Sequence, residues 1–181
     1  MPIHPLLLRP SDAADVPAIA AIYAHHVVHG AGTFELEPPD AAEIARRRDD
    51  VTGKGLPWLV AERAGAVVGY AYANHFRPRP AYRYCLEDSI YVAPEAQGRG
   101  VGRLLLAELL ARCTALGARQ MLAVIGDAAN AGSIGLHAAL GFRHTGVLAA
   151  SGWKFDRWLD VVLMQRVLGL GATAPPTQEQ P

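Results

Sequence analysis

The chain has 181 residues, and its 17 basic side chains balance 17 acidic ones. A hydrophobic fraction of 51% and a charged fraction of 19% are those of a compact soluble domain with its own core. The even charge disfavours binding to nucleic acid, and no segment approaches the length of a membrane span. Cys85 and Cys113 have neither metal-ligand nor redox-motif spacing, which indicates reduced thiols in a cytoplasmic protein.

The first half of the chain predicts a strand, two helices and two further strands. A capping Ser11 or Asp12 precedes apolar residues at helical spacing, and Gly30 closes this first helix. The stretch PPDAAEIARRRDDV predicts the second helix. The apolar runs PWLVAER and AVVGYAYANHF surround Ala64 and Gly65, which indicates a hairpin.

The second half alternates strands with helices. The prolines of RPRPAYRY require a loop, which precedes a strand in CLEDSIYVA and a leucine-rich helix that Gly117 ends. A buried strand, a short helix in NAGSIGLHAALGF and a strand pair, RHTGVLAAS and WKFDRWLDVVLMQRV, follow. We expect a single domain over residues 1–168 and a disordered tail over the Pro-rich, polar residues 169–181.

This order of elements predicts the fold class. Adjacent hairpins imply antiparallel neighbours, and only the two strands that flank the leucine-rich helix need run parallel. The expected fold is α/β (α+β), with a mixed and mostly antiparallel sheet of about seven strands and about four flanking helices.

Three glycines, Gly98, Gly100 and Gly102, stand between a predicted strand and the leucine-rich helix. They allow successive N–H groups to point into one concavity at a helix start, which is a favourable site for phosphate. Arg99 and Arg103 can add charge at its rim. The spacing fits neither a Rossmann loop nor a P-loop, and a plain strand-to-helix connection is the alternative.

These glycines and their surroundings resemble the GCN5-related N-acetyltransferase (GNAT) superfamily, whose pyrophosphate loop reads Q/R-x-x-G-x-G/A. The later segment NAGSIGLHAALGF also matches the superfamily's Asn and Gly-Phe unit. The resemblance implies that the loop holds the pyrophosphate of acetyl-coenzyme A and that the preceding strand bulges to grip the pantetheine. The implied cofactor contacts are Ile90, Tyr91, Val92, Gln97, Gly98, Arg99, Gly100, Val101, Gly102, Arg103, Asn130 and Ser133.

Further stretches, among them GTFELEP, EDSIYV, LAVIG and WKFDRWLDVVLMQ, resemble the phosphinothricin and methionine sulfoximine N-acetyltransferase branch. This branch implies direct acetyl transfer in a ternary complex to the α-amine of a small amino acid analogue, such as phosphinothricin, methionine sulfoximine or methionine sulfone. It also implies a homodimer and no metal. The alternatives are acetylation of a peptide N-terminus or another small amine, and a non-catalytic acetyl-CoA-binding regulatory module.

Acetyl transfer needs a base, because an amino acid's amine is mostly protonated at neutral pH. Glu87 and Asp88 precede the strand that is expected to grip the cofactor. Strand alternation places them on opposite faces, so that only one can line the site, and Ser89 and Tyr91 share the face of Glu87. Glu87 matches the base of the branch, and a solvated strand end is the competing interpretation.

The departing thiolate needs a proton, which the superfamily often supplies from a tyrosine on the last helix. Here that position holds His137, which could donate because imidazole titrates near neutral pH. A packed histidine is the alternative. Backbone N–H groups around Val92 are expected to polarise the acetyl carbonyl.

The substrate is expected to contact a basic, aromatic loop, HFRPRPAYRY, because arginine forks suit carboxylate and phosphinate oxygens. Solvated loop arginines and a core phenylalanine are the alternatives. His25 and His29 lie four residues apart but lack an obvious third ligand, so no metal site is predicted. The expected substrate contacts are Phe34, Arg77, Arg79, Tyr82 and Tyr91.

Overall fold

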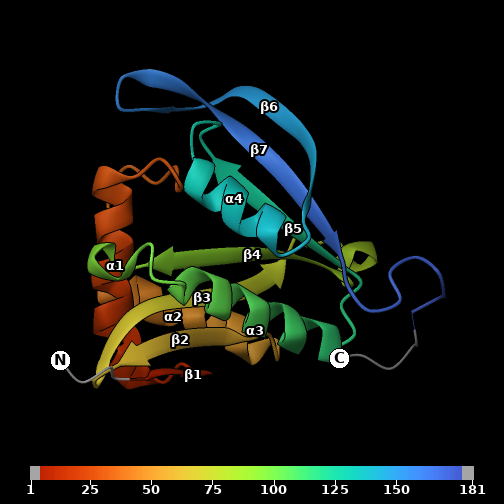
Figure 1. Cartoon of the computed structure of the whole chain (residues 1–181), viewed down its shortest axis with the longest axis horizontal. Helices are drawn as coiled ribbons and strands as arrows, with labels where there is room; N and C mark the ends of the chain where they lie inside the picture. The colour runs from red at the N-terminus through yellow and green to blue at the C-terminus, as the bar shows by residue number, and fades with distance from the viewer. Residues whose placement is uncertain (1–4, 177–181) are drawn as a thin grey trace.

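The computed structural model describes residues 5–176 (Figure 1). Its strands are β1 (Leu6–Pro10), β2 (Trp58–Arg63), β3 (Ala66–His75), β4 (Cys85–Val92), β5 (Gln120–Gly126), β6 (Arg143–Lys154) and β7 (Arg157–Val167). Its helices are α1 (Val16–His29), α2 (Ala41–Gly53), α3 (Val101–Ala115) and α4 (Ala131–Ala139). Three short 3-10 turns cover Ala13–Asp15, Pro80–Tyr82 and Pro94–Ala96.

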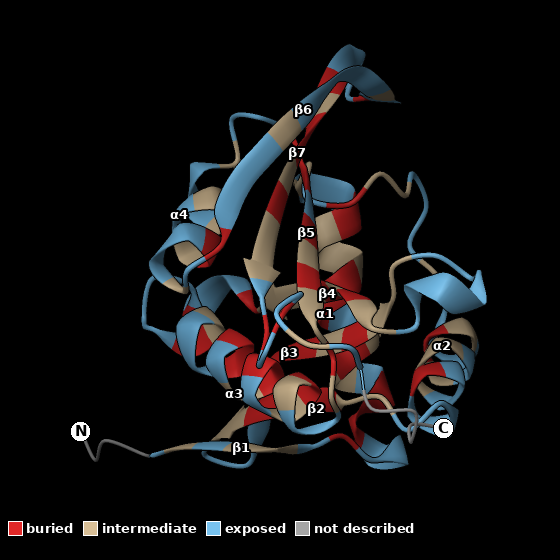
Figure 2. Ribbon diagram, turned by 90° about the vertical axis from the view of Figure 1, so that its right-hand side faces the viewer, coloured by how far each residue is buried: buried red, intermediate tan, exposed pale blue. Residues whose placement is uncertain are grey.

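All seven strands form one sheet in the order β1-β2-β3-β4-β5-β7-β6. Only β4 and β5 run parallel, and every other neighbouring pair is antiparallel. The helices α1 and α2 lie on one side of the sheet, and α3 and α4 lie on the other side (Figure 2). The predicted fold class and the order of its elements are therefore confirmed.

The helix boundaries follow from local chemistry. Asp12 forms a capping box with Asp15 at the turn before α1, and Gly117, at φ 81°, follows the last turn of α3. One stripe of α1 is buried against the sheet, and it comprises Val16, Ile19, Ile22, Tyr23 and Val27. No helix within residues 5–176 is long and apolar enough to cross a membrane.

The strands β4 and β5 separate halfway along their length. β4 pairs with β3 in continuous register from Leu86 to Val92, whereas its pairing with β5 ends where Asp88 meets Ala123. No register shift marks β4 in the described sheet, so the expected bulge takes the form of a divergence between two strands. The segment from Ser89 to Val92 therefore faces an opening in the sheet.

The β2-β3 and β6-β7 hairpins differ in how clearly the sequence marks their turns. The turn at Ala64 and Gly65, with φ of 52° and 78°, lies where the sequence predicts it. The last hairpin turns at Phe155 and Asp156, with φ of 53° and 54°, inside the stretch that we expected to be a single strand. That predicted boundary is wrong, because Phe155 and Asp156 lack the glycine of the usual Asn-Gly or Asp-Gly turn signal.

Part of the predicted tail has defined contacts. Directly before the tail, the backbone N–H of Leu168 donates to Arg119 O at 3.0 Å, and within the tail Gly171 O and Pro175 O accept from the Arg119 side chain. Residues 169–176 thus lie against the start of β5. The remainder of the predicted tail, residues 177–181, lies outside the described residues.

Candidate active site

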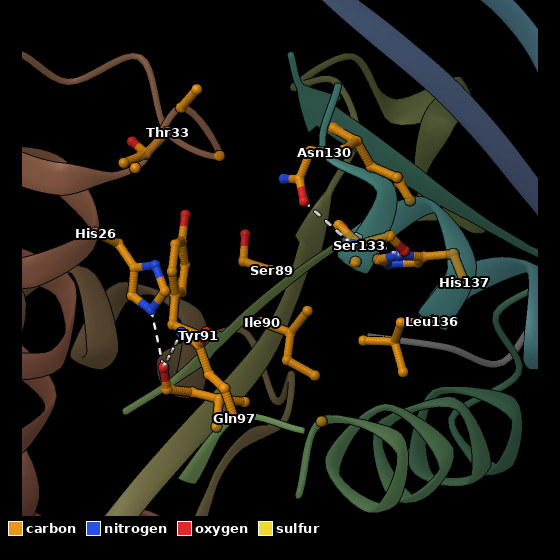
Figure 3. A pocket seen from close by; sticks show the side chains of 18 of the residues that line it. His26, Thr33, Ser89, Ile90, Tyr91, Gln97, Asn130, Ser133, Leu136 and His137 are labelled. Carbon is orange, nitrogen blue, oxygen red and sulfur yellow. Dashed lines mark hydrogen bonds between the residues drawn. The ribbon is translucent and has the colours of Figure 1, made fainter. Parts of the chain in front are cut away.

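A cavity of about 950 Å³ occupies the opening between β4 and β5. Its walls come from the end of α1 and the loop after it, from the loop before α3, and from the first turns of α3 and α4. Figure 3 shows Thr33 and Asn130 on opposite sides of it, with Ser89 between them. The fold thus brings segments that lie far apart in the sequence together around one cavity.

One wall is a concavity of backbone amides. Gly98 and Gly100 have φ of 68° and 80°, and Gly100 is the N-cap residue of α3, which no side chain caps. The first amides of this helix are thus open to a ligand, at the positive end of the helix dipole. Arg103 also lines the cavity. Arg99 is exposed and does not line it, so the structure gives that residue no direct place in the site.

The Val92 carbonyl, next to this amide wall, accepts two side-chain hydrogen bonds. Nε2 of His26 lies 2.9 Å from Val92 O, and Nε2 of Gln97 lies 3.3 Å from it. Because a carbonyl only accepts, Nε2 of His26 carries a proton, and burial lowers the pKa of this histidine despite that bond. His26 was not among the predicted site residues, since its only signal in the sequence is its place in the stretch HHVVH.

Glu87 lies half-buried in the cavity wall. Burial is the main cause that raises its pKa, repulsion from Asp88 adds to this effect, and the charge of Arg77 opposes it. A carboxylate with a raised pKa holds a proton more firmly and is a stronger base than an exposed one. The site thus contains an acid suited to accept a proton from an amine.

Asp88 and His137 form a buried pair on the other face of β4. Nε2 of His137 lies 3.0 Å from Asp88 Oδ2, and both side chains are 2% exposed. Nδ1 of His137 donates to Ser133 O at 2.7 Å, while Asp88 Oδ1 has no hydrogen-bond partner among residues 5–176. Burial lowers the pKa of His137, but the bond and charge of Asp88 raise it more, so the net shift is upward.

The cavity reaches both faces of β4. Tyr91, which shares a face with Glu87, packs against Tyr23 and His26 of α1, whereas Asp88 faces α4. Both acids nevertheless line the cavity. The expectation that only one of them could do so is wrong, because the divergence of β5 opens the sheet beside them.

Stacked aromatic rings cover the sheet beside Glu87. Trp58 is 3% exposed, and its ring lies 4.1 Å from that of Tyr72, with an interplanar angle of 10°. Tyr70 continues the stack and lies 5.3 Å from Tyr91. Burial raises the pKa of all three tyrosines, which keeps their hydroxyls protonated. This stack packs against Tyr91, which itself lines the cavity, and so supports that part of the wall from behind.

Several predicted substrate contacts lie outside the cavity wall. Arg77 stacks on the Phe76 ring at 4.6 Å, and Tyr82 is 41% exposed in a short 3-10 turn. Arg79 is exposed as well, and Phe34 packs behind the wall. The structure therefore brings together the predicted base and most cofactor contacts, but it does not place these four residues in the cavity lining.

The histidine pair on α1 has no third partner for a metal. The rings of His25 and His29 lie 4.7 Å apart at the cavity edge. Among the described residues, no group of three His, Cys, Asp or Glu side chains could hold a metal ion.

The fold and the site agree with the class of protein that the sequence resembles, the acetyltransferases. Residues 21–142 match the model of the acetyltransferase (GNAT) family, and the chain belongs to this family.

Two relatives and one solved structure indicate the branch. Phosphinothricin N-acetyltransferase of Alcaligenes faecalis is 57% identical over 162 residues, which cover 90% of this chain and 82% of the relative. L-methionine sulfoximine/L-methionine sulfone acetyltransferase of Pseudomonas aeruginosa is 39% identical over 169 residues, covering 93% and 98%. The crystal structure of a GNAT phosphinothricin acetyltransferase from Sinorhizobium meliloti in complex with acetyl-CoA has a TM-score of 0.93 and 52% identity, covering 96% and 94%. The predicted family and branch are confirmed.

Proposed function

We propose that this protein transfers the acetyl group of acetyl-CoA to the α-amine of a small amino acid analogue of the phosphinothricin, methionine sulfoximine or methionine sulfone type. The observation that carries this proposal is the uncapped start of α3 beside the opened strand pair. The names of two relatives and the acetyl-CoA in a similar structure support the substrates and the carrier.

The diphosphate of the carrier fits the amide wall. The proposed contacts are the backbone of Gly98 to Gly102 and the side chain of Arg103, because they combine open N–H groups with positive charge. A Cβ at Gly100 would enter open space, which is consistent with a ligand lying there. Acetyl-CoA supplies the activated acyl thioester, and the segment from Ile90 to Val92 is the proposed support for its pantetheine and carbonyl.

The acceptor amine requires deprotonation, and Glu87 is the proposed base. Its pKa is raised, mainly by burial, and it lies in the cavity on the α1 side of the sheet. A carboxyl with a raised pKa takes a proton from an ammonium group more readily than an exposed glutamate. Proton removal at a Glu87 oxygen, directly or through water, leaves the amine lone pair free.

His137 is the proposed proton source for the thiolate, in its pair with Asp88. The raised pKa of His137 favours a proton at Nε2, where Asp88 Oδ2 shares it. Because both ring nitrogens are hydrogen-bonded, the transfer requires the Nε2 bond to be exchanged. The packed-histidine interpretation predicts instead that His137→Asn lowers thermal stability without a specific change in turnover.

A thiol-release assay tests the function. Purified protein and acetyl-CoA are mixed with phosphinothricin, methionine sulfone or a short peptide, and the free thiol is measured. We expect turnover with the first two amines and none with the peptide. Turnover with the peptide alone would overturn the proposed substrate class. Binding of acetyl-CoA without turnover of any amine would support a regulatory module.

We also propose that a second copy of this chain covers the β6-β7 hairpin. β6 is an edge strand and most of its residues are exposed (Figure 2). Unpaired edges and large apolar patches are features of association surfaces. The exposed apolar side chains of the hairpin are Val147, Leu148, Trp153, Phe155 and Trp158.

Sedimentation velocity tests this homodimer. We expect the wild type to sediment as a dimer and Trp158→Lys to shift the population toward monomer, because a charge would enter the apolar patch. A monomeric wild type at micromolar concentration would contradict it. The cytoplasmic location stays a prediction from the sequence.

A further inference from the structure

A buried lysine that has no part in the proposed chemistry joins the last hairpin to the loop after α1. Lys154, at the end of β6, is only 4% exposed. Its Nζ donates to Gly30 O and to Thr33 O, both at 2.9 Å. One ammonium group thus ties both ends of the segment 30–33 to the hairpin.

The ring of Phe34 fills a space that two glycines leave open. A Cβ on Gly152 would lie 2.3 Å from Phe34 Cε2 and 2.4 Å from Cδ2. A Cβ on Gly126 would lie 2.9 Å from Phe34 Cε1 and 2.2 Å from Ala31 O. Neither glycine has a positive φ, so the need for glycine here comes from close packing and not from backbone conformation. We call Phe34, Gly126, Gly152 and Lys154 the Phe34 clamp.

The segment held by the clamp is a wall of the cavity. Residues 30–33 line it, and a Cβ at Gly32 would lie 3.5 Å from Asn130 Nδ2, so the segment reaches the start of α4. Thr33 Oγ1 is 2.9 Å from the Tyr23 hydroxyl, which fixes the same wall to α1. Because α1 packs on the face of β4 that carries Glu87, the wall lies on the acceptor side of the site.

We propose that the Phe34 clamp positions the 30–33 wall and thereby determines which acceptor amines reach Glu87. Phe34 acts from behind the wall, although the family resemblance implied a direct contact with substrate. The inference rests on the proposed acetyl transfer and deepens it. Because the carrier wall is formed by residues 97–103, loosening the clamp should change selection of the amine and spare binding of acetyl-CoA.

A pair of glycine variants on one strand tests this inference. In Gly152→Ala the new methyl group would displace the Phe34 ring, whereas Gly146→Ala, also on β6, would meet no heavy atom within 4 Å. We expect Gly152→Ala to lower kcat/KM for methionine sulfone about tenfold, because even a small displacement of a wall that positions the substrate slows the reaction. Its acetyl-CoA Kd from calorimetry and all constants of Gly146→Ala should stay at wild-type values.

Rescue distinguishes positioning from general damage. Phe34→Leu removes the ring atoms that the new methyl would strike, so Gly152→Ala with Phe34→Leu should recover much of the lost kcat/KM. Equal kinetics for folded Gly152→Ala and Gly146→Ala would overturn the inference. A loss of acetyl-CoA affinity in Gly152→Ala as large as its loss of kcat/KM would overturn the inference as well.

Amide hydrogen exchange in residues 30–33 tests the Phe34 clamp independently of enzymatic activity. Lys154→Met removes both ties, so amide exchange in residues 30–33 should be faster, while Lys54→Met, at the exposed end of α2, should leave it unchanged. This measurement also applies if Gly152→Ala does not fold. Faster exchange without acetyl transfer by the wild type would show that the proposed function fails and the clamp stands. Unchanged exchange in Lys154→Met would overturn the clamp.

Discussion

The two halves of the cavity are built from different parts of the chain. One half is the proposed site of the acetyl-CoA diphosphate, here called the carrier half, and the other is the proposed site of the amine, the acceptor half. The carrier half consists mainly of backbone, with left-handed Gly98 and Gly100 before an uncapped helix start. The acceptor half depends on side chains from distant segments, such as Glu87 in the cavity wall and Phe34 behind it. Backbone amides bind a diphosphate in any member of a family, whereas side chains can be exchanged to suit one amine. The comparison indicates that carrier affinity and amine selectivity should be separable by mutation.

The largest expected effect separates the halves directly. Glu87→Gln removes the proposed base, and kcat should fall by about 10²–10⁴, the usual contribution of general acid–base catalysis. Its acetyl-CoA Kd should not change, because the amide wall stays intact. Steady-state kinetics and calorimetry measure the two quantities. Glu95→Gln, an exposed acid near the carrier loop, is the control, and a Glu87→Gln enzyme with wild-type kcat would dismiss this base.

A substitution in the carrier half should instead weaken the binding of acetyl-CoA. Gly100→Ala puts a methyl group into the cavity at a φ of 80°, so the acetyl-CoA Kd should rise about tenfold from the strain and the lost space. Gly55→Ala, at a φ of 71° in an open turn, carries the same backbone cost and should keep its Kd. Calorimetry with both proteins makes the comparison. The idea of an amide wall fails if the two variants bind the carrier equally well.

A smaller effect concerns the charge of the loop before β4. Arg77 lowers the pKa of Glu87 against burial and Asp88, so Arg77→Ala should raise that pKa further. Since the carboxylate form is the base, the acidic limb of the kcat/KM profile should move to higher pH. Arg79→Ala, in the same loop, should leave the limb in place. Coinciding profiles for Arg77→Ala and the wild type would contradict this electrostatic link.

The smallest effect is on stability. The folded chain holds the Glu87 proton more tightly than the unfolded chain, so this residue costs stability as pH rises through its raised pKa. Glu87→Gln should therefore have a higher Tm than the wild type at pH 8, with a difference that shrinks toward pH 4. Calorimetric scans at both values check this. A Tm difference that grows in acid would show that the pKa is not raised.

The features that could be predicted from the sequence are those with a local signal. Apolar periodicity, Gly117 and Ala64-Gly65 are local signals, and they correctly predicted the order of elements and the parallel pair. The amide wall was also recognisable, because glycine spacing before a helix is a local pattern.

Long-range contacts left no such pattern. The Asp88–His137 pair joins residues 49 apart, and the Lys154 bonds span more than a hundred residues. The turn at Phe155 and Asp156 contains no glycine, so it lacks the usual local signal and was misplaced by a few residues. Packing of distant segments decided the Asp88–His137 and Lys154 contacts, and no single window of sequence contains both partners.

The three tryptophans lie in two separate surroundings. Trp58 is buried in the aromatic stack beside Glu87, whereas Trp153 and Trp158 are 53% and 63% exposed on the last hairpin. Iodide should quench the red-shifted emission of the hairpin pair and leave the blue-shifted emission of Trp58. The native chain therefore carries two separable tryptophan signals, so that a change at the proposed dimer surface can be followed apart from a change in the buried aromatic stack.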